Sequence, residues 1–256
     1  MLTIQAVSAF NDNYIWFIQQ PDSKNLLIVD PGDAQPVIEA IEQQQLNPIA
    51  LLITHHHSDH IGGIRELVSR YDIPVYGPKS EDIPFLTHPL TACENLRISS
   101  EFPSMKVIDV PGHTNGHIAF LIGENLFCGD TLFGAGCGRL LGGTAKQLHA
   151  SLQLIAYLPE HTNIYCAHEY TQANLRFAAI VEPNNTEIKR RILETDDLLS
   201  KDQPSIPSLL RIELQTNPFL RCHQPDVIKA AQHFSGHQLL DSEAVFSSLR
   251  LWKDRF

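Results

Sequence analysis

The sequence predicts an α/β domain followed by a helical C-terminal domain, and two observations support this. In the first 168 residues, short apolar runs that read as strands alternate with segments of helical periodicity. After residue 168 every periodic segment is helical, and prolines lie in several of the breaks between segments. Strands interleaved with helices, and then helices alone, are typical of an α/β domain that carries a helical one. We therefore expect domains at 1–168 and 169–256.

The expected elements follow from the spacing of apolar residues. An apolar strand at 25–30 ends at Pro31-Gly32, and another at 49–53 leads into a histidine-rich loop. Thr144-x-x-Gln147 is a capping box that opens a helix running to about residue 158. The other strands expected are 3–7, 14–18, 75–76, 96–99, 105–110, 117–122, 125–128 and 163–167. The other helices expected are 36–44, 61–71, 173–181, 186–199, 208–216, 225–234 and 242–254.

Composition and charge exclude several classes of function. The chain is 43% hydrophobic and 19% charged, which is ordinary for a soluble globular protein. It has no run of about 18 apolar residues, so no membrane span is expected. The net charge of −10 argues against a nucleic-acid partner. With no signal-peptide pattern and no Cys-x-x-Cys among five cysteines, we expect a cytoplasmic protein with reduced thiols. We also expect a monomer.

The stretch that organises the chain is Thr54-His55-His56-His57-Ser58-Asp59-His60. Four imidazoles and a carboxylate in one loop leave many ring nitrogens to satisfy, and they would repel one another if protonated. A divalent metal removes both difficulties, because neutral imidazole and carboxylate oxygen are its natural ligands. Residues two apart can turn the same way, so His55 and His57 can hold one ion, while Asp59 and His60 reach a second. The internal position of the motif, directly after a strand, argues against a histidine tag.

Three further strand-like runs also end at a possible metal ligand, namely His113, Asp130 and His168. Ligands at strand ends are held by a rigid sheet and can converge on one edge of it. Two histidines and a bridging aspartate would complete two ligand sets, one for each of two ions. His56 lies between ligands that must face the opposite way, so we expect it outside the coordination sphere. His117 begins an apolar strand and is expected to support the ligands from the core.

Together these motifs resemble the metallo-β-lactamase superfamily and, within it, the glyoxalase II (hydroxyacylglutathione hydrolase) family. The resemblance runs almost from end to end and implies an αββα metallo-β-lactamase-like sandwich with a helical C-terminal domain. The superfamily pattern is carried by His55-x-His57-x-Asp59-His60, Pro111-Gly112-His113-Thr114, Gly129-Asp130 and Ala167-His168-Glu169-Tyr170. The family pattern is carried by Ala135-Gly136-Cys137-Gly138-Arg139, Gly143-Thr144, His168-Glu169-Tyr170-Thr171, Asn217-Pro218-Phe219 and Arg250-Leu251-Trp252-Lys253-Asp254.

The resemblance implies a role for each ligand and a reaction. The implied cofactors are two divalent ions, zinc first, with iron and manganese as alternatives. The implied reaction is hydrolysis of the thioester S-lactoylglutathione to lactate and glutathione by a metal-bridged hydroxide, the second step of methylglyoxal detoxification. Asp59 and Asp130 are then the catalytic carboxylates. The implied sets are His55, His57 and His113 for the first ion, Asp59, His60 and His168 for the second, and Asp130 as the bridge.

The resemblance also implies a substrate site made of Arg139, Tyr170, Arg250 and Lys253, which match positions that contact glutathione. Arg250 and Lys253 lie three apart on the last expected helix and therefore share a face. The second domain is nearly neutral, with 11 Lys and Arg against 12 Asp and Glu, whereas the first is strongly acidic; this suits an anionic ligand. Leu141 departs from the family pattern, which commonly has an aromatic residue there, so a stacking or hydroxyl contact is not expected.

Three other functions fit parts of the sequence. A glutathione-persulfide dioxygenase on the same fold would use a single iron held by two histidines and one aspartate, and would leave Asp59, His60 and His168 idle. Another hydrolase of the superfamily, such as a lactonase or nuclease, would share the metal ligands, but a nuclease needs a basic face that this chain lacks. A metal-dependent binding module without catalysis would not need all seven ligand positions.

Overall fold

The structure is a computed structural model that describes residues 2–256 and forms two compact units. Unit 1 comprises Met1–Asp109 and Asn115–Gly129, and unit 2 comprises Val110–Thr114 and Asp130–Phe256. The short segment 110–114 thus belongs to unit 2, although its neighbours on both sides belong to unit 1. These units differ in extent from the predicted domains 1–168 and 169–256, which stay a prediction.

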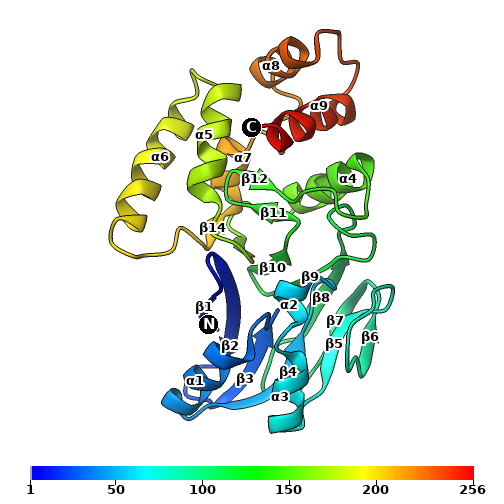
Figure 1. The fold of residues 1–256 in the computed structure, drawn as a ribbon, viewed down its shortest axis with the longest axis vertical. Coiled ribbons are helices and arrows are strands. Elements are labelled where there is room, and N and C mark those ends of the chain that lie inside the picture. Colours follow the sequence, from blue (N-terminus) through cyan, green and yellow to red (C-terminus); the bar gives the residue numbers. More distant parts are fainter. Residues whose placement is uncertain (1) are drawn as a thin grey trace. The chain divides into compact units, whose positions relative to one another are not determined.

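Unit 1 contains a mixed sheet whose strand order follows the sequence. Its first three strands pair antiparallel, and the remaining strands are added in parallel. Helices α1 (Ala34–Gln44) and α3 (Ile64–Tyr71) lie beside this sheet, as Figure 1 shows. They pack against it through an apolar cluster that includes Val37, Ile41 and Leu67. The strands are β1 (Thr3–Ala9), β2 (Asn13–Gln19), β3 (Asn25–Val29), β4 (Asn47–Leu52), β5 (Val75–Pro78) and β6 (His88–Leu90).

Unit 1 also contains four antiparallel strands of a second sheet, in the order β10 (Asn125–Gly129), β9 (Ile118–Ile122), β8 (Met105–Asp109) and β7 (Cys93–Leu96). The prediction of a strand at 96–99 is wrong, because the strand ends where that prediction begins. Leu96 pairs with Met105, the first residue of β8, so the residues after Leu96 have no strand residue opposite them.

Unit 2 consists of helices and short strand pairs. The capping box is confirmed at the start of α4 (Ala145–Ala156), where Thr144 Oγ1 accepts from Gln147 N and Gln147 Oε1 accepts from Thr144 N. The predicted helix 208–216 is shortened to α7 (Leu210–Thr216), because β14 (Ser208–Leu209) pairs with β13 (Asn163–Cys166).

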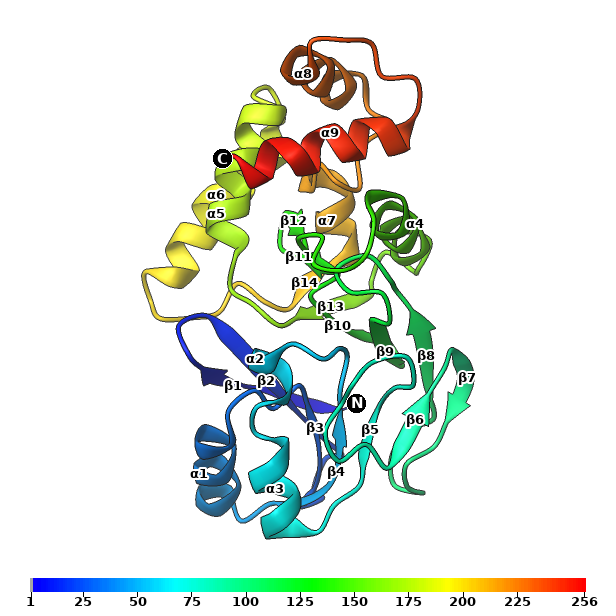
Figure 2. The same cartoon turned by 45° about the vertical axis from the view of Figure 1, so that its right-hand side comes forward.

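The remaining helices of unit 2 lie in pairs, α5 beside α6 and α8 beside α9 in both views (Figures 1 and 2). Unit 2 also has a two-stranded hairpin of β11 (Leu132–Phe133) and β12 (Gly136–Cys137), which the sequence analysis missed. The paired helices are α5 (Thr171–Val181), α6 (Thr186–Leu199), α8 (Pro225–Ser235) and α9 (Ser242–Asp254).

Among the described helices, none combines the length and apolar character that a bilayer crossing requires.

Candidate metal centre

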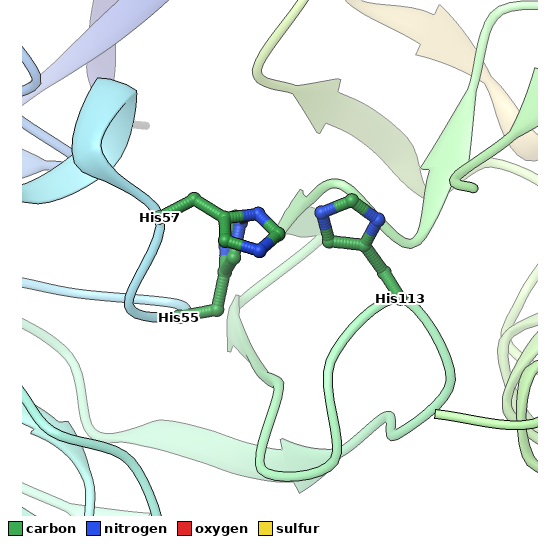
Figure 3. A group of neighbouring side chains, drawn as sticks. All are labelled: His55, His57 and His113. Carbon is green, nitrogen blue, oxygen red and sulfur yellow. Dashed lines mark hydrogen bonds between the residues drawn. The ribbon is translucent and has the colours of Figure 1, made fainter. Parts of the chain in front are cut away.

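In unit 1 the histidine loop follows β4 and runs into the short helix α2 (Ser58–Ile61). His55 and His60 are fully buried, whereas His57 and Asp59 are half-buried. His55 Nε2 lies 3.1 Å from His57 Nδ1, and Figure 3 shows both rings extending from this loop. His60 Nε2 lies 3.6 Å from Asp59 Oδ2. The loop therefore places His57 beside His55 and Asp59 beside His60, and the rings of His55 and His60 also lie close, with centroids 4.0 Å apart.

Asp30, at the end of β3, orients this loop and was not identified from the sequence. Its carboxylate accepts hydrogen bonds from Thr54 N (2.8 Å), Thr54 Oγ1 (2.7 Å) and His60 Nδ1 (3.0 Å). A carboxylate only accepts, so the proton of the His60 ring is on Nδ1 and the lone pair is on Nε2, where a metal can use it. Asp30, His55 and His60 offer ligand atoms within 4.8 Å of one another. Because Asp30 already receives three donors, we interpret it as a residue that orients His60.

Glu81 is a second supporting residue that the sequence did not reveal. Its Oε2 accepts from both the backbone N–H and the ring Nδ1 of His56, each at 2.7 Å, and its Oε1 accepts from Gly116 N at 2.9 Å. The carboxylate is buried, whereas the His56 side chain is 43% exposed. Glu81 therefore ties the histidine loop to the loop between β8 and β9, and its bond fixes the His56 ring. No local sequence pattern marks either acid: Asp30 directly follows an apolar strand, and Glu81 lies in a polar stretch next to Asp82.

Close packing behind the histidine loop explains why residue 129, directly before Asp130, is a glycine. His117 is buried, stacks on His55 with ring centroids 4.5 Å apart and bonds through Nδ1 to the carbonyl of Ile118. Gly129 has φ +48°, and a Cβ atom there would lie 2.4 Å from Thr54 Oγ1 and 2.9 Å from the His117 ring. Glycine is thus required both by the backbone conformation and by the space. His117 supports the ligands from the core, as the sequence led us to expect.

Unit 2 groups the other three predicted ligands, His113, Asp130 and His168, all of which are buried. Asp130 Oδ2 lies 3.4 Å from His113 Nε2, and Asp130 Oδ1 lies 3.4 Å from His168 Nε2. These separations exceed the 2.7–3.2 Å of an ordinary N–H···O bond. One carboxylate oxygen therefore faces each imidazole at a distance that suits two separate ions better than two hydrogen bonds.

The ring orientation of His113 is fixed from behind. His113 Nδ1 donates to the backbone carbonyl of Arg139 at 2.8 Å, so its Nε2 carries the lone pair that faces Asp130. Figure 3 draws His113 on the loop that follows β8. His168 stacks on Tyr170, with centroids 4.7 Å apart and an angle of 6° between the planes. Neutral imidazoles with fixed tautomers and carboxylates form the donor set that zinc, iron and manganese accept.

The predicted substrate residues differ in their accessibility. Arg139 is exposed, and Lys253 and Tyr170 are half-buried. The Lys253 ammonium lies over the rings of Phe177 and Phe256, at 5.8 and 5.3 Å from their centroids. Burial lowers the pKa of Lys253, and the positive charges of Arg250 and Arg139 lower it further. A bound anion would reduce the repulsion among these cations, which fits a site for a carboxylate.

Arg250 is different, because it is only 4% exposed. Its Nη1 donates to the carbonyls of Cys137 (2.9 Å) and Gly138 (3.4 Å), and its Nη2 donates to Asp254 Oδ1 (3.0 Å). Arg250 and Lys253 both lie on α9, and Lys253 is the more exposed of the two. A role of either residue in substrate binding stays a prediction. Burial also raises the pKa of the neighbouring Cys137 thiol to about 11, so this cysteine is no nucleophile at neutral pH. Leu141, at the position where the family pattern commonly has an aromatic residue, is 55% exposed.

Comparisons with known proteins agree with this geometry. Residues 10–168 match the family model described as the metallo-β-lactamase superfamily, and residues 169–256 match the model described as hydroxyacylglutathione hydrolase C-terminus. A relative from Nitrosomonas eutropha named hydroxyacylglutathione hydrolase is 49% identical over 256 residues, which is all of both chains. Among solved structures, the BLEG-1 B3 metallo-β-lactamase is similar with a TM-score of 0.63 and 25% identity, over 86% of this chain and 99% of that one.

A further solved structure bears on the kind of metal site. The protein TTHA1623, solved in a di-iron-bound form, is similar with a TM-score of 0.59 and 25% identity, over 85% of this chain and all of that one.

Proposed function

The chain belongs to the hydroxyacylglutathione hydrolase family of the metallo-β-lactamase superfamily, and from this we propose that it hydrolyses S-lactoylglutathione and related S-(2-hydroxyacyl)glutathiones to a 2-hydroxy acid and glutathione. It has the metallo-β-lactamase fold, with mixed sheets and a helical C-terminal region, and it is a metal-dependent hydrolase. The prediction of the fold class from the sequence is confirmed.

We propose that the predicted ligands bind two ions. His55, His57 and His113 would hold the first, Asp59, His60 and His168 would hold the second, and Asp130 would be shared by both. The observation that carries this proposal is the carboxylate of Asp130, which presents one oxygen to His113 and the other to His168 at equal distances of 3.4 Å. Zinc is the first candidate on donor chemistry, and the di-iron form of a similar protein supports iron as the alternative.

Bound ions would lower the pKa of a water molecule to about 7, and this would supply hydroxide at neutral pH. The chain's own residues hold the ligands ready for this. Asp30 and the Arg139 carbonyl fix the tautomers of His60 and His113, and Asn13 Nδ2 donates to Asp59 Oδ2 at 3.1 Å. A thiolate leaving group, with a pKa of about 8.5, departs without a strong general acid. A thioester is therefore a substrate that this donor set can cleave.

Arg139 and Lys253 supply the positive charge for the carboxylates of glutathione, because both reach the surface of unit 2. Tyr170 stacks on His168, and its hydroxyl is the uncharged polar group that we propose for the substrate site. The carboxylates do not change charge during thioester hydrolysis, so these contacts bind the ground state and transition state equally and act on KM. None of the five cysteines forms a disulfide in the described structure, which suits the reducing cytoplasm that we propose as the location.

The test uses purified protein whose metal content has been measured. Thiol release from S-lactoylglutathione is followed with a chromogenic thiol reagent, beside oxygen uptake with glutathione persulfide. We expect thioester cleavage by protein that holds two equivalents of metal, with no oxygen uptake. Oxygen uptake with about one iron per chain, and no thiol release, would instead identify the persulfide dioxygenase and overturn the proposal.

A further inference from the structure

The turn between β1 and β2 carries an exposed aromatic residue, Phe10. The turn comprises residues 10–12, since Ala9 at the end of β1 pairs with Asn13 at the start of β2. Phe10 is 59% exposed, although Ala9 and Asn13 are both buried. A single exposed apolar residue is ordinary on a protein surface, so its exposure alone is no evidence of a function.

The backbone of Phe10 adopts a conformation that a bulky residue rarely takes. Its φ is +52°, in the left-handed region that glycine, asparagine and aspartate tolerate much better. Asn11 and Asp12 follow directly, yet the left-handed position itself carries phenylalanine. Turn chemistry would favour glycine or asparagine at residue 10. Strain of this kind is concentrated at functional sites, which directs attention to what the ring lies beside.

Two contacts place this turn beside Asp59, a proposed metal ligand in the same unit. Asn13 Nδ2 donates to Asp59 Oδ2 at 3.1 Å. A Cβ atom at Gly32 would lie 1.8 Å from the carbonyl oxygen of Asp59 and 3.0 Å from Cε2 of the Phe10 ring. Gly32 thus adjoins both residues, and it has no side chain that could cover the ring. The exposed ring of Phe10 therefore lies close to the segment that carries Asp59.

The thioester proposed as substrate has a glutathione end and an acyl end, and the acyl end has not yet been assigned to a residue. The residues predicted for glutathione all belong to unit 2, namely Arg139, Tyr170, Arg250 and Lys253. The acyl carbonyl is the group that reacts at the metal ions, so its substituent must lie near a metal ligand. The methyl group of a lactoyl substituent is apolar, and an exposed phenyl ring is a surface that can remove it from water.

We propose that Phe10 packs against the acyl substituent of the thioester and favours 2-hydroxyacyl groups that carry an apolar branch or ring. This inference rests on the proposed function, because it assumes that the thioester carbonyl reacts beside Asp59. The left-handed backbone of the turn presents the ring to solvent next to this ligand, where a substrate can cover it.

The test compares Phe10→Gly with the matched control Phe85→Gly. Phe85 is the same residue type in the same unit, is 45% exposed and also has a left-handed backbone, with φ +58°. Its ring lies 5.1 Å from the guanidinium carbon of Arg65 on α3. The ratio kcat/KM is measured on S-glycoloylglutathione, S-lactoylglutathione and S-mandeloylglutathione, whose 2-hydroxyacyl groups carry no branch, a methyl group and a phenyl ring. The zinc content of each protein is measured beside it.

The expected effect grows with the apolar part of the acyl group. Relative to the value on the glycoloyl thioester, Phe10→Gly should lower kcat/KM about 3-fold on the lactoyl thioester and about 10-fold on the mandeloyl thioester. The zinc content and kcat/KM on the glycoloyl thioester should stay at the wild-type level. Phe85→Gly should keep the wild-type ratios among all three substrates.

Urea unfolding separates this role from a purely structural one. Glycine tolerates the left-handed backbone, and the ring that it removes is mostly exposed, so the urea midpoint of Phe10→Gly should not fall below that of the wild type. Phe10→Asn, which also suits this backbone and has no ring, should repeat the loss of selectivity if Phe10→Gly does not fold. A lower midpoint with an equal fall on all three thioesters would show that Phe10 supports the fold, and the proposal would fail.

The same measurements separate this inference from the proposed function. If the wild type cleaves all three thioesters and both Phe10 variants keep its ratios among them, the acyl substituent does not contact Phe10 and only the present inference fails. If the wild type cleaves none of them, the proposed function fails, and the inference fails with it.

Discussion

Replacement of Glu213 should cost unit 2 a large part of its stability. Glu213 lies on α7, is completely buried, and binds four donors with its two carboxylate oxygens. Oε1 accepts from Arg191 Nη2 (2.5 Å) and Ser208 Oγ (2.6 Å), while Oε2 accepts from Ala135 N (2.9 Å) and Asn217 Nδ2 (3.2 Å). The carboxylate thus joins α6, β14, α7 and the hairpin in one network.

The change Glu213→Gln keeps the shape of the side chain but removes its charge and one acceptor. Whichever way the amide is turned, its NH2 group faces two donors, and Arg191, itself only 5% exposed, loses its counter-charge. Breaking a buried ion pair by removing one partner costs about 3–5 kcal/mol. The control is Glu194→Gln on α6, where Glu194 Oε1 lies 3.8 Å from Arg190 Nε and both side chains are more than half exposed. An exposed pair of this kind contributes about 0–1 kcal/mol.

Urea unfolding, with the metal content of each variant matched, measures the free energy of unfolding by linear extrapolation. We expect Glu213→Gln to lose about 3–5 kcal/mol, and the double variant Arg191→Met with Glu213→Gln to recover part of this loss, because the uncompensated cation is gone. A Glu213→Gln variant within about 1 kcal/mol of the wild type would refute the account of a buried charge network.

Three further predictions concern the site. Asp130→Ala should abolish thioester cleavage and lower the metal content, because two cations lose the anion between them; retention of both metals by elemental analysis would remove the bridging role. His56→Gln should keep two equivalents of metal, since the His56 ring is bonded to Glu81, and loss of one equivalent would make His56 a ligand. Burial and neighbouring cations lower the pKa of Lys253 below the ordinary 10.4 of lysine. Lys253 loses its charge above this pKa, so the KM for S-lactoylglutathione should rise as the pH increases through it. Lys253→Met should remove this pH dependence, and a KM profile identical in the two proteins would show that Lys253 does not bind the substrate.

The parts of the structure that the sequence predicts well are those that depend on neighbouring residues along the chain. The alternation of apolar residues located β3, β4 and the long helices, and the spacing in the histidine loop predicted the pairs His55 with His57 and Asp59 with His60. The capping box at Thr144 is confirmed for the same reason, because both partners lie within one helical turn.

The features that were missed depend on contacts between distant residues. Asp30 and Glu81 act on residues 30 and 35 positions away, and no local pattern marks them. The hairpin is too short and too rich in glycine to show an alternation. Ser208 belongs to a strand only because β13 lies beside it, which overrides the helical periodicity of the segment.

The close contact between α5 and the hairpin of β11 and β12 has a consequence for how this protein can vary. A Cβ atom would lie 2.2 Å from Thr171 Oγ1 at Gly134 and 2.3 Å from Asn174 Nδ2 at Gly136. Residues 134, 136 and 138 thus contribute space rather than side chains, so a saturation library should tolerate almost no replacement there, whatever its polarity. The hairpin's own side chains Leu132 and Phe133 are already buried, so repair should come from a second substitution on a helix. Directly after the hairpin the constraint is relaxed, since the side chains of Arg139 and Leu141 are exposed. New substrate preferences can therefore be selected at these two positions while the neighbouring metal ligand stays in place.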